Sequence, residues 1–156
     1  MANENKPTAD FPEGSAACNF LKGYNCAQSV FAAHAEKFGL TRECALRLSA
    51  PLGGGVGRMR NVCGAFTACA MILGLKAASA NPDKDSKKNI YAETQKLAEE
   101  FKKLNGSIIC SKLLDASDAR KTEPTPDSRT EEYYAKRPCL KVVENADALI
   151  KDFLLK

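Results

Sequence analysis

Apolar side chains recur at helical intervals along most of the chain. In residues 84–104 the positions that share a face are Ile90, Thr94, Leu97, Phe101 and Leu104. The last segment, residues 139–155, carries its apolar stripe on Val142, Val143, Ala146, Leu149, Ile150 and Phe153. Repeats of this kind predict amphipathic helices, and the sequence shows no alternation typical of half-buried strands. The pattern therefore predicts an all-α protein.

Capping and breaking residues divide the pattern into segments. Asn25 is followed three residues later by Gln28, the spacing of a capping box, so we expect a helix to begin at Cys26 and to stop before Gly39. The predicted helices cover residues 15–22, 26–38, 42–50, 63–78, 84–104, 107–114 and 139–155, with another between residues 128 and 138. Residues 115–127, with prolines at 124 and 126, are expected to form an exposed loop. We predict a single-domain helical bundle of about five to seven helices over residues 15–156, preceded by a flexible tail at residues 1–14.

Composition narrows the class of protein. The chain has 156 residues, of which 44% are hydrophobic and 27% charged, an ordinary globular mixture. It has no Trp and only 7% aromatic residues, and its net charge of +4 is spread among interleaved acidic and basic residues. Exposed rings in a basic groove are what binding of single-stranded nucleic acid requires, so we expect no nucleic-acid partner. The longest apolar stretch, residues 62–75, is shorter than the roughly 18 residues of a membrane span, so no membrane partner is expected either.

The N-terminal segment bears on how the cysteines are interpreted. Residues 1–14 are polar and lack the apolar core of a secretory signal, so we expect a cytoplasmic protein in a reducing compartment. There, the seven cysteines are better interpreted as buried thiols, metal ligands or reversible redox groups than as permanent disulfides.

Four cysteines fall at the starts of predicted helices. Cys26 follows the capping Asn25, Cys63 opens the central helix, Cys110 lies in a first turn, and Cys139 follows a proline. The partial positive charge and free N–H groups of a helix start stabilise the thiolate, which is the reactive and metal-binding form. Two further cysteines, at 18 and 44, also fall near helix starts, so placement alone favours reactive thiols without selecting four.

The order of these cysteines and of the segments around them matches a known pattern. The matching pieces are residues 25–30 (NCAQSV), 52–59 (LGGGVGRM) and 63–68 (CGAFTA), followed by Cys110 within 107–114 and Cys139 within 137–143. On these residues, which extend over positions 23–143, the chain resembles the C_GCAxxG_C_C family of redox-active proteins.

The resemblance implies that Cys26, Cys63, Cys110 and Cys139 are the cysteines of a common site. It leaves Cys18, Cys44 and Cys69 as additional cysteines, which we expect to be core residues. Ala68 stands where the family pattern has glycine, which we expect to loosen a helix contact at most. The family is named largely for its cysteines, so the resemblance implies a site more firmly than a reaction.

Two other features allow a functional and a structural interpretation. His34, the single histidine, could join a metal site or act as a base, but a structural role on its half-apolar helix face is favoured. The segment Gly53–Gly57 departs from the dinucleotide-binding motif, because Arg60 stands where the last glycine is needed and no strand precedes it. Arg58, Arg60 and the following helix start could hold a small anion, although a tight turn between packed helices is favoured. Tyr133 and Tyr134, next to Arg137, could line a cleft.

Three functions remain open at this point. The favoured one is thiol–disulfide or electron-transfer chemistry by Cys26, Cys63, Cys110 and Cys139, which needs no cofactor and has Cys63 or Cys26 as the attacking thiol. Its partner would be an unidentified redox protein or a small-molecule oxidant. Four cysteines allow three pairings, and the sequence does not choose among them.

The first alternative uses the same four cysteines as ligands of a metal ion or an iron–sulfur cluster, although no local pair of ligands favours it. The second is a non-enzymatic helical binding module, in which the cysteines are only packed inside. A homo-oligomer is compatible with each of the three functions, and whether the protein is an enzyme stays open.

Overall fold

The computed structural model describes residues 10–156, and these residues form an all-α structure, which confirms the predicted fold class. The α-helices are α1 (Ala16–Leu21), α2 (Cys26–His34), α3 (Arg42–Ser49), α4 (Gly64–Ala77), α5 (Lys84–Asn105), α6 (Cys110–Leu113), α7 (Ala116–Ala119), α8 (Glu131–Lys136) and α9 (Cys139–Leu149). Short 3-10 turns, η2 (Ala35–Phe38) and η3 (Ala50–Leu52), extend α2 and α3, and a π-helical turn, η4 (Ile150–Leu154), extends α9. Residues 1–9 of the expected tail lie outside the described part of the chain.

The predicted capping box is present at the start of α2. The Gln28 backbone N–H donates to Oδ1 of Asn25 at 2.9 Å, and the Asn25 backbone N–H donates to Oε1 of Gln28 at 3.1 Å. Each bond satisfies a donor that the first helical turn leaves without an intrahelical partner. The side chains of Ser15, Thr41 and Asp83 cap α1, α3 and α5, each by accepting one hydrogen bond from a backbone N–H of the first turn.

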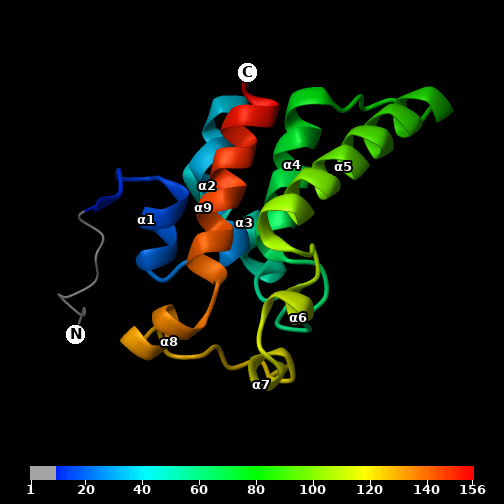
Figure 1. Ribbon diagram of the computed structural model, residues 1–156. Coiled ribbons are helices and arrows are strands. Elements are labelled where there is room, and N and C mark those ends of the chain that lie inside the picture. The colour runs from blue at the N-terminus through cyan, green and yellow to red at the C-terminus, as the bar shows by residue number, and fades with distance from the viewer. Residues whose placement is uncertain (1–9) are drawn as a thin grey trace.

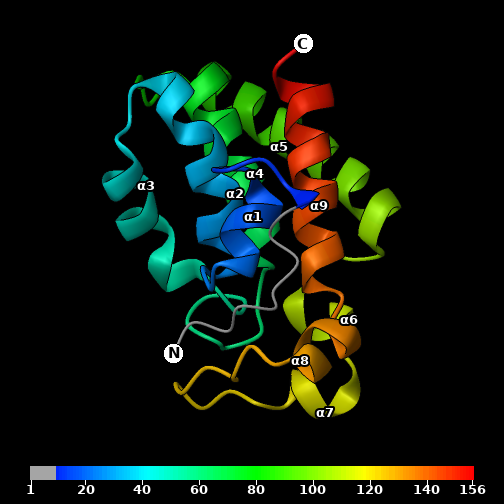
Figure 2. The same ribbon diagram turned by 90° about the vertical axis from the view of Figure 1, so that its left-hand side faces the viewer.

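The centre of the bundle consists of α2, α4 and α9, which run side by side (Figures 1 and 2). Their facing side chains, such as Val30, Ile72 and Val143, are fully buried. On the outside, α1 packs against α2 and α9, α3 packs against α2, and α5 packs against α4 and α9. Because the three central helices run in the same direction, their N-terminal ends meet at one end of the molecule (Figure 1).

Both predicted apolar stripes end differently from the expectation. In α5, Leu97 and Phe101 are buried, whereas Leu104 in the last turn is exposed. After α9, Phe153 is 36% exposed and Leu154 is buried in its place. The π-helical turn η4 explains the second difference, since its wider turn rotates the residues that follow relative to an α-helical stripe.

The main departure from the predicted elements lies in residues 110–136. The part expected to be a loop contains α7, capped by the Asp115 side chain, which accepts from the Asp118 N–H at 2.8 Å. In addition, α6 begins at Cys110 rather than at residue 107. Such single turns raise the number of α-helices in the described chain to nine, above the expected five to seven. They gather beneath the N-terminal ends of the central helices (Figures 1 and 2).

No helix within residues 10–156 combines the length and apolar character needed to cross a membrane.

Candidate functional site

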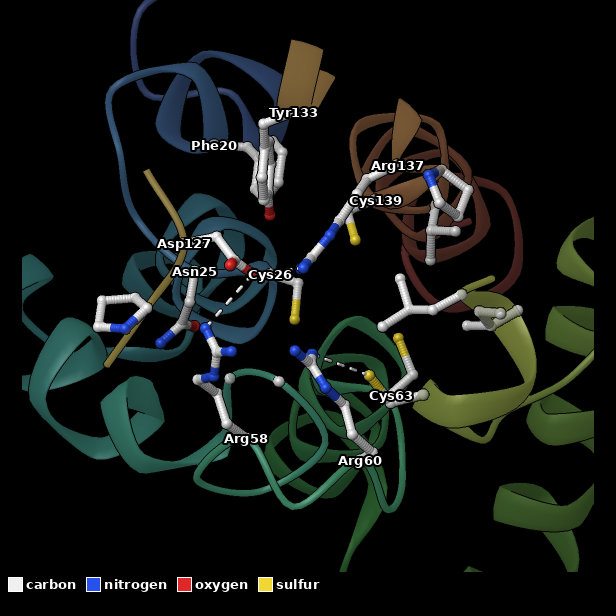
Figure 3. A pocket seen from close by; sticks show the side chains of 18 of the residues that line it. Phe20, Asn25, Cys26, Arg58, Arg60, Cys63, Asp127, Tyr133, Arg137 and Cys139 are labelled. Carbon is white, nitrogen blue, oxygen red and sulfur yellow. Dashed lines mark hydrogen bonds and ion pairs between the residues drawn. The ribbon is translucent and has the colours of Figure 1, made fainter. Parts of the chain in front are cut away.

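A cavity of about 370 Å³ lies where the N-terminal ends of the helices meet. Its lining includes Cys26, Cys63, Cys110 and Cys139, the four cysteines that the sequence singled out. In Figure 3 the sulfur atoms of the labelled Cys26, Cys63 and Cys139 point into it. The other three cysteines do not line this cavity: Cys18 and Cys69 are buried in the bundle, and Cys44 is half-buried on α3.

Each of the four cysteines stands at a helix start, as expected from the sequence. Cys26, Cys110 and Cys139 are the first residues of α2, α6 and α9, and Cys63 occupies the position just before α4. The fold thus brings four helix starts from distant parts of the chain around one cavity.

An isolated β-bridge joins the residues that directly precede Cys63 and Cys110. Val62 pairs with Ile109 in antiparallel orientation. On either side of this pair, the Cys63 N–H donates to the carbonyl of Ile108 and the Cys110 N–H donates to the carbonyl of Asn61, each at 2.7 Å. These two short hydrogen bonds fix the backbones of both cysteines, although the cysteines belong to different helices.

The glycine-rich segment forms a tight left-handed turn. Gly54, Gly55, Val56, Gly57 and Arg58 have consecutive positive φ angles between 55° and 73°. Such angles are costly for residues with a Cβ, and most of all for a β-branched residue such as Val56. The turn is held by backbone hydrogen bonds, among them Arg60 N–H to the Gly54 carbonyl at 3.0 Å. Residue 55 must be glycine, since a Cβ there would lie 2.8 Å from Cβ of Cys110.

Gly64 allows α2 and α4 to approach each other closely at the cavity. A Cβ on Gly64 would lie 2.7 Å from Sγ of Cys26 and 3.0 Å from Cβ of Ala27. Both distances are too short for ordinary contact, so the Cys26 sulfur occupies space that any other residue at position 64 would fill. The position of the Cys26 sulfur therefore explains why residue 64 is glycine.

Cys26 is the one cysteine of the four whose environment favours the thiolate. Hydrogen bonding from the Cys63 thiol, supported by the backbone N–H groups of Gly54, Ala27 and Gly64, lowers the pKa of Cys26 to about 6 in spite of burial. The same hydrogen bond, together with burial and the charge on Cys26, raises the pKa of Cys63 well above its usual value. The pair therefore holds one proton near neutral pH, with the negative charge on Cys26.

At the other two cysteines, burial raises the pKa by more than the helix start lowers it. It raises the pKa of Cys139 to about 12, and the negative charge of Cys26 acts in the same direction. Burial also raises the pKa of Cys110, although Arg60, whose Nη1 lies 3.7 Å from Sγ of Cys110, opposes this effect. Position at a helix start thus does not by itself produce a thiolate, and of Cys26 and Cys63 it is Cys26 whose surroundings favour the thiolate.

Four arginines line the cavity: Arg58, Arg60, Arg129 and Arg137. Arg58 pairs with Asp127 at 3.4 Å and with Glu123 at 3.3 Å. Arg137 pairs with Asp118 at 3.2 Å and also with Asp127. In Figure 3 the guanidinium groups of Arg60 and Arg137 point toward the cysteines, whereas that of Arg58 points toward Asp127.

Residues 124–129 close one side of the cavity, which the sequence did not indicate. Pro124, Pro126, Asp127 and Arg129 belong to its lining. Arg129 donates to the carbonyls of Phe20 at 2.8 Å and Tyr24 at 3.0 Å, and its guanidinium lies 4.2 Å from the centre of the Phe20 ring. Proline-rich sequence between helices is typical of exposed loops, so no signal short of the tertiary contacts marked these residues.

The expected cleft at the tyrosines is partly present. Tyr133 and Arg137 line the cavity, and the Arg137 guanidinium lies 4.8 Å from the centre of the Tyr133 ring. Burial raises the pKa of Tyr133 to about 12, so it stays protonated at neutral pH. Tyr134 packs against the ring of Tyr133 outside the lining, at 5.4 Å between ring centres.

His34 lies away from the cavity. Its imidazole is buried, and Nε2 lies 2.6 Å from Oδ1 of Asp147 on α9. This contact joins α2 to α9 and agrees with the structural interpretation of His34.

The donor set does not fit a metal site as it is arranged. Across residues 10–156, no three side chains of His, Cys, Asp or Glu are grouped so that they could hold a metal ion. A tetrahedral metal site or an iron–sulfur cluster would require such a grouping of ligands.

Comparison with known proteins identifies one family. Its model, described as "Putative redox-active protein (C_GCAxxG_C_C)", matches residues 24–153. No match was found among curated proteins or among solved structures. The matched range contains the four cysteines of the cavity, the left-handed turn and Gly64, and it covers most of the chain. On this evidence the chain belongs to the C_GCAxxG_C_C family of redox-active proteins.

Proposed function

We propose that the protein carries out thiol–disulfide exchange, with Cys26 as the attacking thiol and Cys63 as the resolving thiol. The observation that carries this proposal is the placement of the two sulfurs. They contact each other at the starts of α2 and α4, with Cys26 held as the thiolate. A thiolate next to a protonated thiol, in a cavity open to a small molecule, is the arrangement that disulfide exchange uses.

In the first step the Cys26 thiolate attacks one sulfur of a partner disulfide. A mixed disulfide forms, the partner's sulfur–sulfur bond breaks, and the released sulfur leaves with the electron pair and takes up a proton. Forming the mixed disulfide removes the negative charge from Cys26, which is one of the causes of the raised pKa of Cys63. Cys63 therefore loses its proton more easily once the first step has occurred.

In the second step Cys63 attacks the Cys26 sulfur. A Cys26–Cys63 disulfide forms and the second half of the partner leaves as a thiol. The partner disulfide has then gained two electrons and two protons. The protein has lost two electrons and the one proton of Cys63, and the second proton comes from solvent. An external dithiol would restore the reduced protein by the reverse sequence. Cys110 and Cys139 supply a second dithiol in the same cavity, to which the disulfide could pass by further exchange.

Exchange of this kind needs a compartment that returns the protein to its dithiol state, so the proposal includes a cytoplasmic location. The oxidant would be a small molecule or a redox protein that presents a disulfide at the cavity.

Differential alkylation with peptide mass spectrometry tests the proposal. Protein purified without oxygen would be compared with the same protein after mild oxidation by a small disulfide. We expect Cys26 and Cys63 to become a disulfide first, while Cys18, Cys44 and Cys69 keep their thiols. A Cys44→Ser variant, altered outside the cavity, should behave like the unaltered protein, whereas Cys63→Ser should accumulate a mixed disulfide at Cys26.

Two results would contradict the proposal. If all seven cysteines stay unreactive until the protein unfolds, they are packing residues and the helical binding module is the better interpretation. If the four cavity cysteines react only after a chelator is added, they are metal ligands.

A further inference from the structure

The cavity contains more guanidinium groups than carboxylates to pair with them. Within residues 10–156, Asp127 is the one carboxylate that lines it, and it pairs with both Arg58 and Arg137. Glu123 and Asp118, outside the lining, complete the pairing of these two arginines. Arg129 is bound to two backbone carbonyls. Among the partners that residues 10–156 offer, Arg60 is the one of the four arginines with neither a carboxylate partner nor a full set of hydrogen bonds.

Arg60 is 6% exposed, and it keeps an unused donor. Its Nε donates to the carbonyl of Lys121 at 3.0 Å and its Nη1 reaches Sγ of Cys110. The buried Nη2 has no hydrogen-bond partner in the part of the chain that the structure describes. Nε of Arg58 is buried without a partner as well. An unpaired guanidinium donor removed from water is costly and therefore calls for an acceptor. Figure 3 shows the end of the Arg60 side chain pointing into the space between the cysteines.

We propose that the cavity binds a small disulfide that carries carboxylate groups, and that Arg60 binds one of these carboxylates. The inference rests on the proposed function and names the class of its substrate. A guanidinium presents its donors in a plane that matches a carboxylate. Arg60 contacts Cys110 and lines the same cavity as Cys26, so a carboxylate held there places the attached sulfur atoms near the attacking thiolate. The cavity volume of about 370 Å³ lies in the range of small-molecule sites.

Charge makes this inference sharply testable. The Cys26 thiolate repels an anion, Arg58 and Arg137 are already paired with carboxylates, and Arg129 is bound to carbonyls. A cavity without Arg60 would therefore offer an anionic disulfide no advantage over a cationic one, whereas an Arg60 that binds a carboxylate makes the anionic disulfide react faster. The probes are 3,3′-dithiodipropionate, which is anionic, 2-hydroxyethyl disulfide, which is neutral, and cystamine, which is cationic.

The rate of Cys26 oxidation by each probe would be measured without oxygen, by quenching with an alkylating agent and counting modified peptides. Dividing each rate by that of the same probe with 2-mercaptoethanol removes the intrinsic reactivity of the probe. We expect the normalised rate with dithiodipropionate to exceed that with cystamine by at least about tenfold, the effect of one hydrogen-bonded charge. Equal rates, or faster reaction with cystamine, would overturn the inference.

Variants assign the preference to Arg60. Arg60→Gln should abolish it, and Arg60→Lys should keep only part of it, because lysine retains the charge without the planar pair of donors. Arg47→Gln is the matched control, since Arg47 lies on α3 with a side chain that is 80% exposed, and it should leave the preference unchanged. Circular dichroism would check that each variant folds. If Arg60→Gln does not fold, the order of rates in the unaltered protein still decides.

A binding measurement separates failure of this inference from failure of the proposed function. Suberate has the two carboxylates of dithiodipropionate at the same spacing along the chain, with two methylene groups in place of the sulfur atoms. Its binding to the reduced protein can be followed by calorimetry. Suberate binding without oxidation of Cys26 by any probe would support the anion site and contradict disulfide exchange. Oxidation without charge preference and without suberate binding would support exchange and overturn the anion site.

Discussion

At the scale of single residues, the chemistry of the site depends on which groups surround each sulfur. All four cavity cysteines stand at helix starts, yet burial keeps Cys110 and Cys139 protonated. Cys26 differs because three backbone N–H groups and the Cys63 thiol point at its sulfur. The charge of a helix start is spread over its first turn and is worth only about 1 kcal/mol, whereas directed hydrogen bonds to a thiolate are stronger.

The first prediction at this scale concerns pH. Because the pKa of Cys26 is lowered to about 6, its alkylation by iodoacetamide should rise with pH and reach its plateau near neutrality. An ordinary thiol, with a pKa of about 8.5, would still be rising there. Cys63→Ala removes the main hydrogen bond, so the midpoint should move upward and the rate at pH 7 should fall roughly tenfold. Peptide mass spectrometry at a series of pH values measures both effects.

Cys44→Ala is the control for this experiment. Its side chain lies on α3, outside the cavity, so the pH midpoint of Cys26 should not move. A midpoint near that of an ordinary thiol in the unaltered protein would show that Cys26 is not held as a thiolate.

At the scale of elements, the site depends on how closely α2, α4 and the left-handed turn approach one another. The turn places Gly54 N–H at the Cys26 sulfur and Gly55 against Cys110. The start of α4 places Gly64 against the same sulfur. Glycine at these positions is required by the proximity of neighbouring atoms, and at 54 and 55 also by positive φ angles.

The second prediction tests the close approach of α4 to Cys26 by comparing two glycines of α4. Gly64→Ala would place a methyl group 2.7 Å from Sγ of Cys26, so we expect a loss of about 1–3 kcal/mol in the free energy of unfolding, with slower alkylation of Cys26. Gly74→Ala is the matched control in α4, where a Cβ would meet no atom within 4 Å. That change should be neutral or should stabilise by up to about 1 kcal/mol, because alanine favours the helix. Urea denaturation measures both variants, and an equal effect of the two would refute the steric argument.

At the scale of the whole molecule, the cavity exists because the chain after α6 folds back beneath the bundle. Arg129 holds this segment, residues 120–136, in place by binding the carbonyls of Phe20 and Tyr24 and by stacking on the Phe20 ring. No residue of α8 is fully buried, although Tyr133 and Tyr134 pack partly buried against the core. The position of the segment therefore depends on these ring contacts together with a few polar contacts.

The third prediction follows from that anchor. Arg129→Ala should lower the free energy of unfolding by about 2–3 kcal/mol, because it removes two hydrogen bonds from a charged donor and a cation–π contact. Hydrogen exchange should also become faster in residues 120–136 than in α2, α4 and α9, since the segment opens locally. Arg120→Ala, at an exposed position just after α7, is the control and should change neither quantity. Uniformly faster exchange across the bundle would show that Arg129 supports the core instead.

Several features followed from the sequence by itself. Helical periodicity and capping residues determined the fold class, most of the long helices and the capping box of Asn25 and Gln28, because these depend on contacts within a few residues. The positions of Cys26, Cys63, Cys110 and Cys139 near helix starts followed for the same reason. Periodicity could not indicate the π-helical turn that exposes Phe153, since that turn changes the period itself.

Tertiary structure decided what those cysteines have around them. The bridge between Val62 and Ile109, the contact of Cys26 with Gly64 and the cover that includes Asp127 and Arg129 all join parts of the chain that are distant in sequence. A pKa depends on burial and on partners within a few ångströms, and no local pattern encodes either of them. For that reason the sequence could identify four candidate thiols, whereas only their packing distinguished one thiolate from three protonated neighbours.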